Sequence, residues 1–255
     1  MNICIIGAGN MGGAIALGIA KRHPQHQITV TNRTTKKSDR FAGYSNITCS
    51  TNNKRATRGA DVIILAVKPW AIKNVIAEIS DVITAEQTLI SVAGGVSLSD
   101  LESMLPWSCP LFRVIPNIAA AAGESMTFVT PQNADKKTID AVVDLFRAIG
   151  KVDLIEERLL PAATALCSCG IAYAFRYIRA ATQGAVELGL SPDDATRYII
   201  QTLRGAASII DIEHVHPEAA IDIVTTPGGI TIKGLNAMEE KGFSNAVIAG
   251  LKASK

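Results

Sequence analysis

The segment from Thr226 to Thr231 has the most specific chemistry in the chain. Pro227 supplies the φ value of a first helical residue, and Gly228 and Gly229 let a ligand approach the backbone closely. The free N–H groups of a first helical turn attract a small carboxylate, and the Thr231 hydroxyl would lie beside that seat. We therefore predict an anion site here, with an ordinary helix cap as the alternative interpretation.

A glycine-rich turn near the N-terminus predicts a dinucleotide site. It follows the apolar run 3–6 and precedes the small-residue helix 13–20, the context that a GxGxxG pattern requires. The glycines permit a tight turn and close approach of a pyrophosphate, while the helix N-terminus faces the phosphates. The predicted contacts are Gly7, Ala8, Gly9, Asn10, Met11 and Gly12.

The end of the second strand-like run selects the cofactor. An NAD-selective site needs an acid about 20 residues after the glycines to bind the ribose 2′-hydroxyl, but the stretch 31–37 contains none. Arg33 can pair with a 2′-phosphate, and Asn32 and Thr34 can donate hydrogen bonds to it. We predict NADP(H), with NAD(H) at lower preference; a solvated basic turn is the alternative.

Three later loops follow strand-like runs, at the edge where doubly wound sheets bind ligands. The first would pass along the cofactor, the glycines of the second permit backbone contact with it, and the third would close over the nicotinamide. Lys68 in the first loop could instead be a solvent-facing lysine. The predicted contacts are Ala66, Val67, Lys68, Pro69, Ala93, Gly94 and Asn117.

The elements that would position these residues form two unlike halves. Up to about residue 157, strand-like and helix-like segments alternate at βαβ spacing, and the strand-like runs lack a polar face. Those runs are 3–6, 28–31, 61–67, 88–93 and 111–115, with 126–130 and 152–155 as candidate extensions. From Leu160 onward, Ala- and Leu-rich helices follow, some with clear caps such as Ser191. We predict an α/β fold: a Rossmann-like, doubly wound, mostly parallel sheet in residues 1–158 and an all-α dimerisation domain in residues 159–255.

Composition narrows the functional classes. The 255 residues are 48% apolar and 19% charged, so a large core can form, and the net charge of +2 argues against nucleic-acid or membrane-surface partners. Five cysteines without a CxxC pair, and no visible export signal, fit a cytoplasmic protein. The uncharged stretch Leu159 to Phe175 is short for a membrane span and favours a buried helix. No metal site is predicted, because Cys167 and Cys169 would point apart on a helix and the pair His214 and His216 lacks further ligands.

Four motifs in one order resemble the pyrroline-5-carboxylate reductase family over nearly the whole chain. They are the GxGxxG turn, Ala66–Pro69, Arg113–Asn117 and Thr226–Thr231. The resemblance implies NADPH-dependent reduction of Δ1-pyrroline-5-carboxylate to L-proline, the last step of proline synthesis. It also implies a C-terminal helical domain that interlocks in a homodimer, often assembled into decamers. The implied substrate contacts are Thr226, Gly228, Gly229, Ile230 and Thr231, with the Thr231 hydroxyl as the catalytic group near the ring nitrogen.

Two segments depart from the family pattern. Ile118 and Ala119 stand where the family usually has Thr-Pro, and Cys167 to Ile171 replaces a Ser-Gly-Ser-Gly-Pro run. Both lie close to the expected substrate pocket. They leave open an NADP-dependent reductase of another small imino or oxo acid, and less favoured, a non-catalytic NADP-binding sensor.

Overall fold

The computed structural model describes residues 1–34 and 38–255. The part of the basic turn at residues 35–37 therefore lies outside the described residues. The chain divides into two compact units, Met1–Ser168 and Cys169–Lys255.

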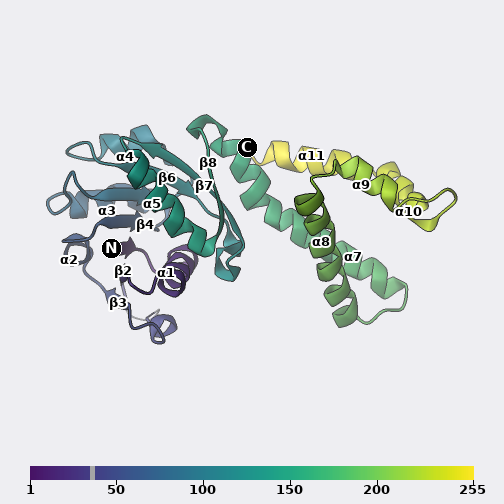
Figure 1. Cartoon of the computed structure of the whole chain (residues 1–255), viewed down its shortest axis with the longest axis horizontal. Coiled ribbons are helices and arrows are strands. Elements are labelled where there is room, and N and C mark those ends of the chain that lie inside the picture. Colours follow the sequence, from purple (N-terminus) through teal and green to yellow (C-terminus); the bar gives the residue numbers. More distant parts are fainter. Residues whose placement is uncertain (35–37) are drawn as a thin grey trace. The chain divides into compact units, whose positions relative to one another are not determined.

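The first unit is built on an eight-stranded sheet (Figure 1). Its order is β3-β2-β1-β4-β5-β6-β7-β8, and every neighbouring pair is parallel except the antiparallel pair β6 and β7. The strands are β1 (Asn2–Ile6), β2 (Gln27–Thr31), β3 (Ile47–Ser50), β4 (Val62–Leu65), β5 (Thr88–Ser91), β6 (Leu111–Ile115), β7 (Ser125–Gln132) and β8 (Gly150–Leu154). This is the predicted Rossmann-like, mostly parallel architecture.

Both faces of the sheet are covered, and its central strands carry buried apolar residues on both faces. On β1, Ile3 and Ile5 belong to the core on one face, while Cys4 and Ile6 belong to the core on the other. Burial raises the pKa of the Cys4 thiol to about 12, so it stays neutral and acts as a small apolar core residue. Strands buried on both sides read as continuous apolar runs, which explains why the sequence predicted them.

Helices from both halves of the βαβ pattern form the two covering layers. Residues of α1 and α5 pack in the first core, and residues of α3 and α4 pack in the second. The helices of this unit are α1 (Asn10–Arg22), α2 (Asn53–Thr57), α3 (Ile72–Ile79), α4 (Leu98–Ser103), α5 (Lys136–Phe146) and α6 (Leu160–Thr164). Short 3₁₀ turns join them: η2 (Asp39–Phe41), η3 (Pro69–Ala71), η4 (Ile118–Ala122), η5 (Arg147–Ile149) and η6 (Glu157–Leu159).

The strand order reverses between β1 and β4, and this switch point positions the site. From β1 the chain moves to β2 and β3 on one side, then returns to β4 and continues on the other side. The loops after β1 and β4 therefore diverge and leave a crevice at the carboxyl ends of the strands.

One strand was not predicted. The edge strand β3 has no buried residue, because it pairs only with β2 and carries polar side chains between two half-buried ones. Its pattern resembles a loop, so periodicity could not find it.

The second unit consists of helices in its described residues. They follow a single π-helical turn, η7 (Ala165–Cys169), and are α7 (Gly170–Glu187), α8 (Pro192–Glu213), α9 (Pro217–Ile223), α10 (Ile230–Glu240) and α11 (Phe243–Ala253). Ser191 caps α8 through the Asp194 amide, as predicted. Helix α7 packs on α8, and the Tyr173 hydroxyl donates to the Gly250 carbonyl at 3.1 Å, which ties α7 to α11.

This helical unit buries little of its apolar surface within one chain. Thr182 and Ala195 are its buried residues among those described. By length and composition alone, one helical stretch, Glu157–Glu187, could cross a membrane, with 17% of its most apolar window buried. The uncharged stretch from Leu159 is thus less buried in the single chain than its composition predicts, because few helices of the same chain cover it.

The compact units divide ten residues after the predicted boundary at 158 and 159. Leu160 and Ala163 explain this position, because they are buried in one cluster with Ile115 and Phe128 of the sheet. The first turns of the long helical stretch therefore belong by contact to the first unit.

Candidate functional site

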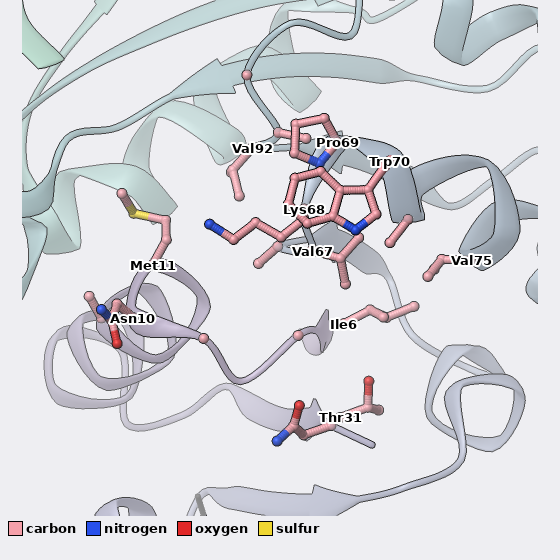
Figure 2. A pocket seen from close by; sticks show the side chains of 18 of the residues that line it. Ile6, Asn10, Met11, Thr31, Val67, Lys68, Pro69, Trp70, Val75 and Val92 are labelled. Atoms are coloured by element: carbon pink, nitrogen blue, oxygen red, sulfur yellow. The ribbon is translucent and has the colours of Figure 1, made fainter. Parts of the chain in front are cut away.

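A cavity of about 920 Å³ lies at the carboxyl ends of β1, β2, β4 and β5 (Figure 2). This volume is in the upper range of small-molecule and cofactor sites. The cavity brings together thirteen of the sixteen predicted cofactor residues: Gly7, Gly9, Asn10, Met11, Asn32, Arg33, Ala66, Val67, Lys68, Pro69, Ala93, Gly94 and Asn117.

The glycine turn after β1 has the geometry that a phosphate cradle needs. Gly7 has φ +113°, and a Cβ there would lie 2.6 Å from the Ala66 carbonyl oxygen. A Cβ on Gly12 would overlap the Gly7 carbonyl, whereas one on Gly9 would meet nothing within 4 Å. Gly7 and Gly12 thus permit tight packing of the turn, and Gly9 leaves its cavity side open for a ligand. The residues present therefore fit a dinucleotide pyrophosphate at the N-terminus of α1.

Ala8 and Gly12 act beneath the turn rather than in the cavity wall. Both are buried, and Ala8 packs in the core cluster of α1 and α5. Their predicted role as direct cofactor contacts stays a prediction, while their packing role is visible here.

Arg40 holds the same turn from behind, and sequence reasoning missed it. Its guanidinium donates to the carbonyl oxygens of Ala8 at 2.8 Å and Gly9 at 2.9 Å. A Cβ on Gly13 would overlap this guanidinium, so the contact requires a glycine there. Burial lowers the pKa of the Arg40 guanidinium, but an arginine side chain stays charged in proteins. Arg40 thereby fixes the backbone of the turn through two of its carbonyl oxygens.

The end of β2 carries the predicted 2′-phosphate residues. Arg33 is exposed, and the Asn32 side chain donates to the Thr34 carbonyl at 3.2 Å, which stabilises the turn. Thr34 lines a small neighbouring cavity that also contains Cys49. The exposed Arg33 guanidinium is accessible to a phosphate and can bind it through charge-assisted hydrogen bonds.

Polar residues from three elements form the floor beside this end, and none of them was predicted. The Thr31 hydroxyl donates to Asn53 Oδ1 at 2.6 Å, and Asn53 Nδ2 donates to Glu78 Oε2 at 2.9 Å. All three residues line the cavity. Because they come from β2, α2 and α3, no local spacing in the sequence could connect them.

Lys68 and Asn117 lie in the cavity wall in different ways. The Lys68 side chain extends from the β4 loop toward Met11 (Figure 2). Asn117 is buried, and its amide is used internally: Nδ2 donates to the Cys167 carbonyl at 3.0 Å, and Oδ1 accepts from the Ala119 N–H at 3.0 Å. Asn117 therefore positions the segment that carries Ser168, which also lines the cavity.

The predicted helix in the second unit is formed, but it begins at Ile230, and Pro227 lies in the turn before it rather than at the first helical position. Gly228 has φ +73°, as the third residue of a type II Pro-Gly turn requires, and the Gly229 N–H donates to the Thr226 carbonyl at 2.9 Å. A Cβ on Gly229 would lie 2.6 Å from Thr226 Oγ1, so a larger residue there would displace the Thr226 hydroxyl. Helix α10 begins at Ile230, and its first turn leaves N–H groups without acceptors inside the helix. Thr231 is exposed in this turn, and the Ile230 side chain is 86% exposed.

The histidines and cysteines have structural roles. His214 ends α8 in a left-handed conformation, and His216 Nδ1 caps α9 by accepting from the Glu218 N–H. Within the described ranges 1–34 and 38–255, no three metal-ligating side chains come together. Cys167 and Cys169 lie in the π-helical turn rather than in the regular helix expected for them.

Two family models match the chain. The model described as pyrroline-5-carboxylate reductase dimerisation matches residues 157–255, and the model described as NADP oxidoreductase, coenzyme F420-dependent, matches residues 2–95.

Individual relatives match nearly the whole length of this chain. Pyrroline-5-carboxylate reductase of Methanosarcina acetivorans is 36% identical over 99% of this chain and 96% of its own length. Pyrroline-5-carboxylate reductase 1 of Dictyostelium discoideum is also 36% identical, and this chain spans 48% of that longer protein. Among solved structures, Plasmodium falciparum pyrroline carboxylate reductase with NADP bound matches with a TM-score of 0.90 at 26% identity, over 100% of this chain and 95% of that one.

Arg40 generates a prediction about dinucleotide affinity. Arg40→Ala leaves the carbonyls of Ala8 and Gly9 without a charged donor, so we expect the KM for NADPH to rise about tenfold while kcat changes less than about twofold. Arg40→Lys should recover only part of this loss, because an ammonium lacks the planar fork. Steady-state kinetics on folded protein checks this, with Arg22→Ala on the exposed end of α1 as the control. An unchanged KM in Arg40→Ala would refute the positioning role.

Proposed function

The chain belongs to the pyrroline-5-carboxylate reductase family, and on that premise we propose that it reduces Δ1-pyrroline-5-carboxylate to L-proline with NADPH, the last step of proline synthesis. The observation that carries this proposal is the Thr226–Thr231 turn, which keeps the residues and the backbone geometry of an anion seat. The dinucleotide cavity lined by the glycine turn supplies the second requirement of such a reductase.

NADP(H) is the proposed cofactor, with NAD(H) at lower preference. It supplies the hydride when bound. The turn from Gly7 to Gly12 would hold its pyrophosphate, and Arg33 with Asn32 and Thr34 would hold the 2′-phosphate. The loops after β4, β5 and β6 would line its path with the residues Ala66, Val67, Lys68, Pro69, Ala93, Gly94 and Asn117. The absence of an acid at positions 32 to 34 supports this preference, because a carboxylate there would repel a phosphate.

The substrate's seat is assigned to the start of α10. Backbone N–H groups around Gly228, Gly229 and Ile230 would bind the carboxylate, and Thr226 would shape the turn around it. The Thr231 hydroxyl would hydrogen-bond the ring nitrogen and orient the ring face. Because an iminium is already electrophilic, orientation supplies most of the catalysis and a strong general acid is not needed.

One observation keeps a second substrate class in view. Ile118 lines the cavity with 61% of its surface exposed, at a position where the family pattern has a polar residue. A larger apolar side chain there would suit another small imino or oxo acid. A non-catalytic NADP-binding sensor is less favoured, because such a protein would not need the Thr231 motif.

We also infer a homodimer through the C-terminal helices, with further assembly into a decamer, in the cytoplasm. The family's dimerisation model covers residues 157–255. The second unit exposes many large apolar side chains, which a helical partner would cover. They include Phe175, Leu188, Ile209, Ile212, Ile223, Val224, Ile230, Phe243 and Ile248.

The proposed reaction predicts a specific substrate order. Purified protein should oxidise NADPH with Δ1-pyrroline-5-carboxylate at a kcat/KM about 100-fold or more above that with pyrroline-2-carboxylate or simple 2-oxo acids, because specificity follows differential transition-state binding. Absorbance at the nicotinamide band measures the rates. A higher kcat/KM with another acid would transfer the proposal to the second class, and NADPH binding without turnover of any would favour the sensor.

The proposed role of Thr231 predicts that its removal slows the chemical step. Thr231→Ala should lower kcat by about 10²- to 10⁴-fold, the range for one positioned polarising or proton-transferring group. Thr231→Ser should retain most of the activity because it keeps the hydroxyl. The matched control is Thr225→Ala, whose hydroxyl bonds the Ile221 carbonyl at 3.1 Å. Wild-type kcat in Thr231→Ala would remove its catalytic role.

The proposed role of Arg33 predicts that its removal weakens binding of NADPH but not of NADH. Arg33→Ala should raise the KM for NADPH about 10- to 100-fold, since it removes a charge-assisted contact to the 2′-phosphate. The KM for NADH, which lacks that phosphate, should stay nearly constant. Kinetics with both cofactors measure the ratio, and Arg147→Ala, at an exposed residue of η5, serves as control. An equal change with NADPH and NADH would contradict this assignment.

A further inference from the structure

Trp70 is the most exposed large apolar side chain described in the first unit. Its surface is 79% exposed, although an indole is among the side chains that gain most from burial. It also lines the cavity (Figure 2). A bare aromatic ring at the rim of a ligand cavity indicates that a ligand covers it.

The backbone that carries Trp70 is firmly held. Pro69 opens the η3 turn, and the Ala71 N–H donates to the Lys68 carbonyl at 2.8 Å, which closes the turn around Trp70. Helix α3 follows at once and is anchored by the fully buried Ile72 and Ile76. Trp70 is therefore presented from a rigid support rather than from a loose loop.

The direction of α3 shows which part of the cavity Trp70 serves. Ala71, Val75 and Glu78 follow at helical spacing and line the cavity on one face. Glu78 bonds Asn53 and packs α3 beside α2, on the side of β2. The wall formed by Trp70, Val75 and Glu78 thus reaches the end of β2, where Asn53 bonds both Glu78 and Thr31.

We propose that Trp70 is the stacking wall of an adenine subsite, in which the indole covers the purine ring of the dinucleotide. This rests on the proposed NADP(H) function. The end of β2, with Arg33, is the 2′-phosphate end of the cavity, and the adenine is the flat ring attached to the same ribose. Stacking on an aromatic side chain is the contact that a purine offers to an exposed indole, and Val75 continues the apolar wall.

The chain contains two tryptophans, which allows a direct optical test. Trp107 is 41% exposed and is not a cavity residue. In Trp107→Phe, the remaining Trp70 is the reporter. In Trp70→Phe, the remaining Trp107 is the matched control. The probe is 2′,5′-ADP, which carries the adenine and the 2′-phosphate but no nicotinamide and does not absorb the tryptophan emission.

We expect saturable quenching of fluorescence by 2′,5′-ADP in Trp107→Phe and no quenching in Trp70→Phe. Nicotinamide mononucleotide should quench neither. Quenching of Trp70 by nicotinamide mononucleotide alone, no response of Trp70 to 2′,5′-ADP, or failure of the wild type to bind 2′,5′-ADP would each overturn the proposal.

Affinity provides a second readout. Trp70→Ala should weaken 2′,5′-ADP binding about tenfold, within the range of base–aromatic stacking, and Trp70→Phe should weaken it less than about threefold. KM should rise equally for NADPH and NADH with kcat unchanged, unlike in Arg33→Ala, because both cofactors contain adenine. An unchanged Kd in folded Trp70→Ala would refute the subsite. Quenching by 2′,5′-ADP in a protein that turns over none of the tested acids would leave the subsite standing while the proposed reaction fails.

Discussion

The candidate site depends on the close backbone contact between the glycine turn and the end of β4. The Gly7 N–H donates to the Thr31 carbonyl of β2, and the Ala66 N–H donates to the Ile6 carbonyl of β1. These bonds join the ends of three neighbouring strands where the strand order reverses, and no side chain fits between Gly7 and Ala66. Arg40 then binds the carbonyls on the rear of the turn. The result is a rigid anion cradle whose parts come from the sheet itself.

Both units have to bury apolar surface, and they do so in different ways. The first unit buries its apolar strands on both faces with its own helices, so its core is complete within one chain. The second unit has helices but no sheet in its described residues, and it leaves large apolar side chains exposed. A surface of this kind needs a partner, which is consistent with the family's dimerisation domain. The apolar stretch Glu157–Glu187 has the composition of a membrane span, and the same property suits a helix that packs against another subunit.

Local sequence patterns found the parts of the molecule that depend on local physics. Apolar runs predicted the central strands, because strands buried on both sides lack a polar face. Glycine spacing predicted the cradle, since only glycine tolerates φ +113° at Gly7 without strain. Arg40 and Asn53 were missed because each gains its role from residues far away in the sequence. Asn117 was predicted as a wall of the cofactor site, and its structural use as a cap and a bridge to Cys167 depends on a contact fifty positions later.

We propose that the departures at Ile118 and Ala119 bear on specificity rather than on the fold. The η4 turn that carries them is held at its start by the Asn117 side chain, which accepts from the Ala119 N–H. It is held at its end by Gly123 in the left-handed conformation. Both restraints act on the backbone, so the side chains at 118 and 119 can change without moving the turn. Ile118 then projects into the cavity from a fixed position, and its size and polarity alter what fits there. The Asn117 side chain that holds this turn also lines the cavity, so one backbone restraint serves both the cofactor wall and the variable side chain at position 118.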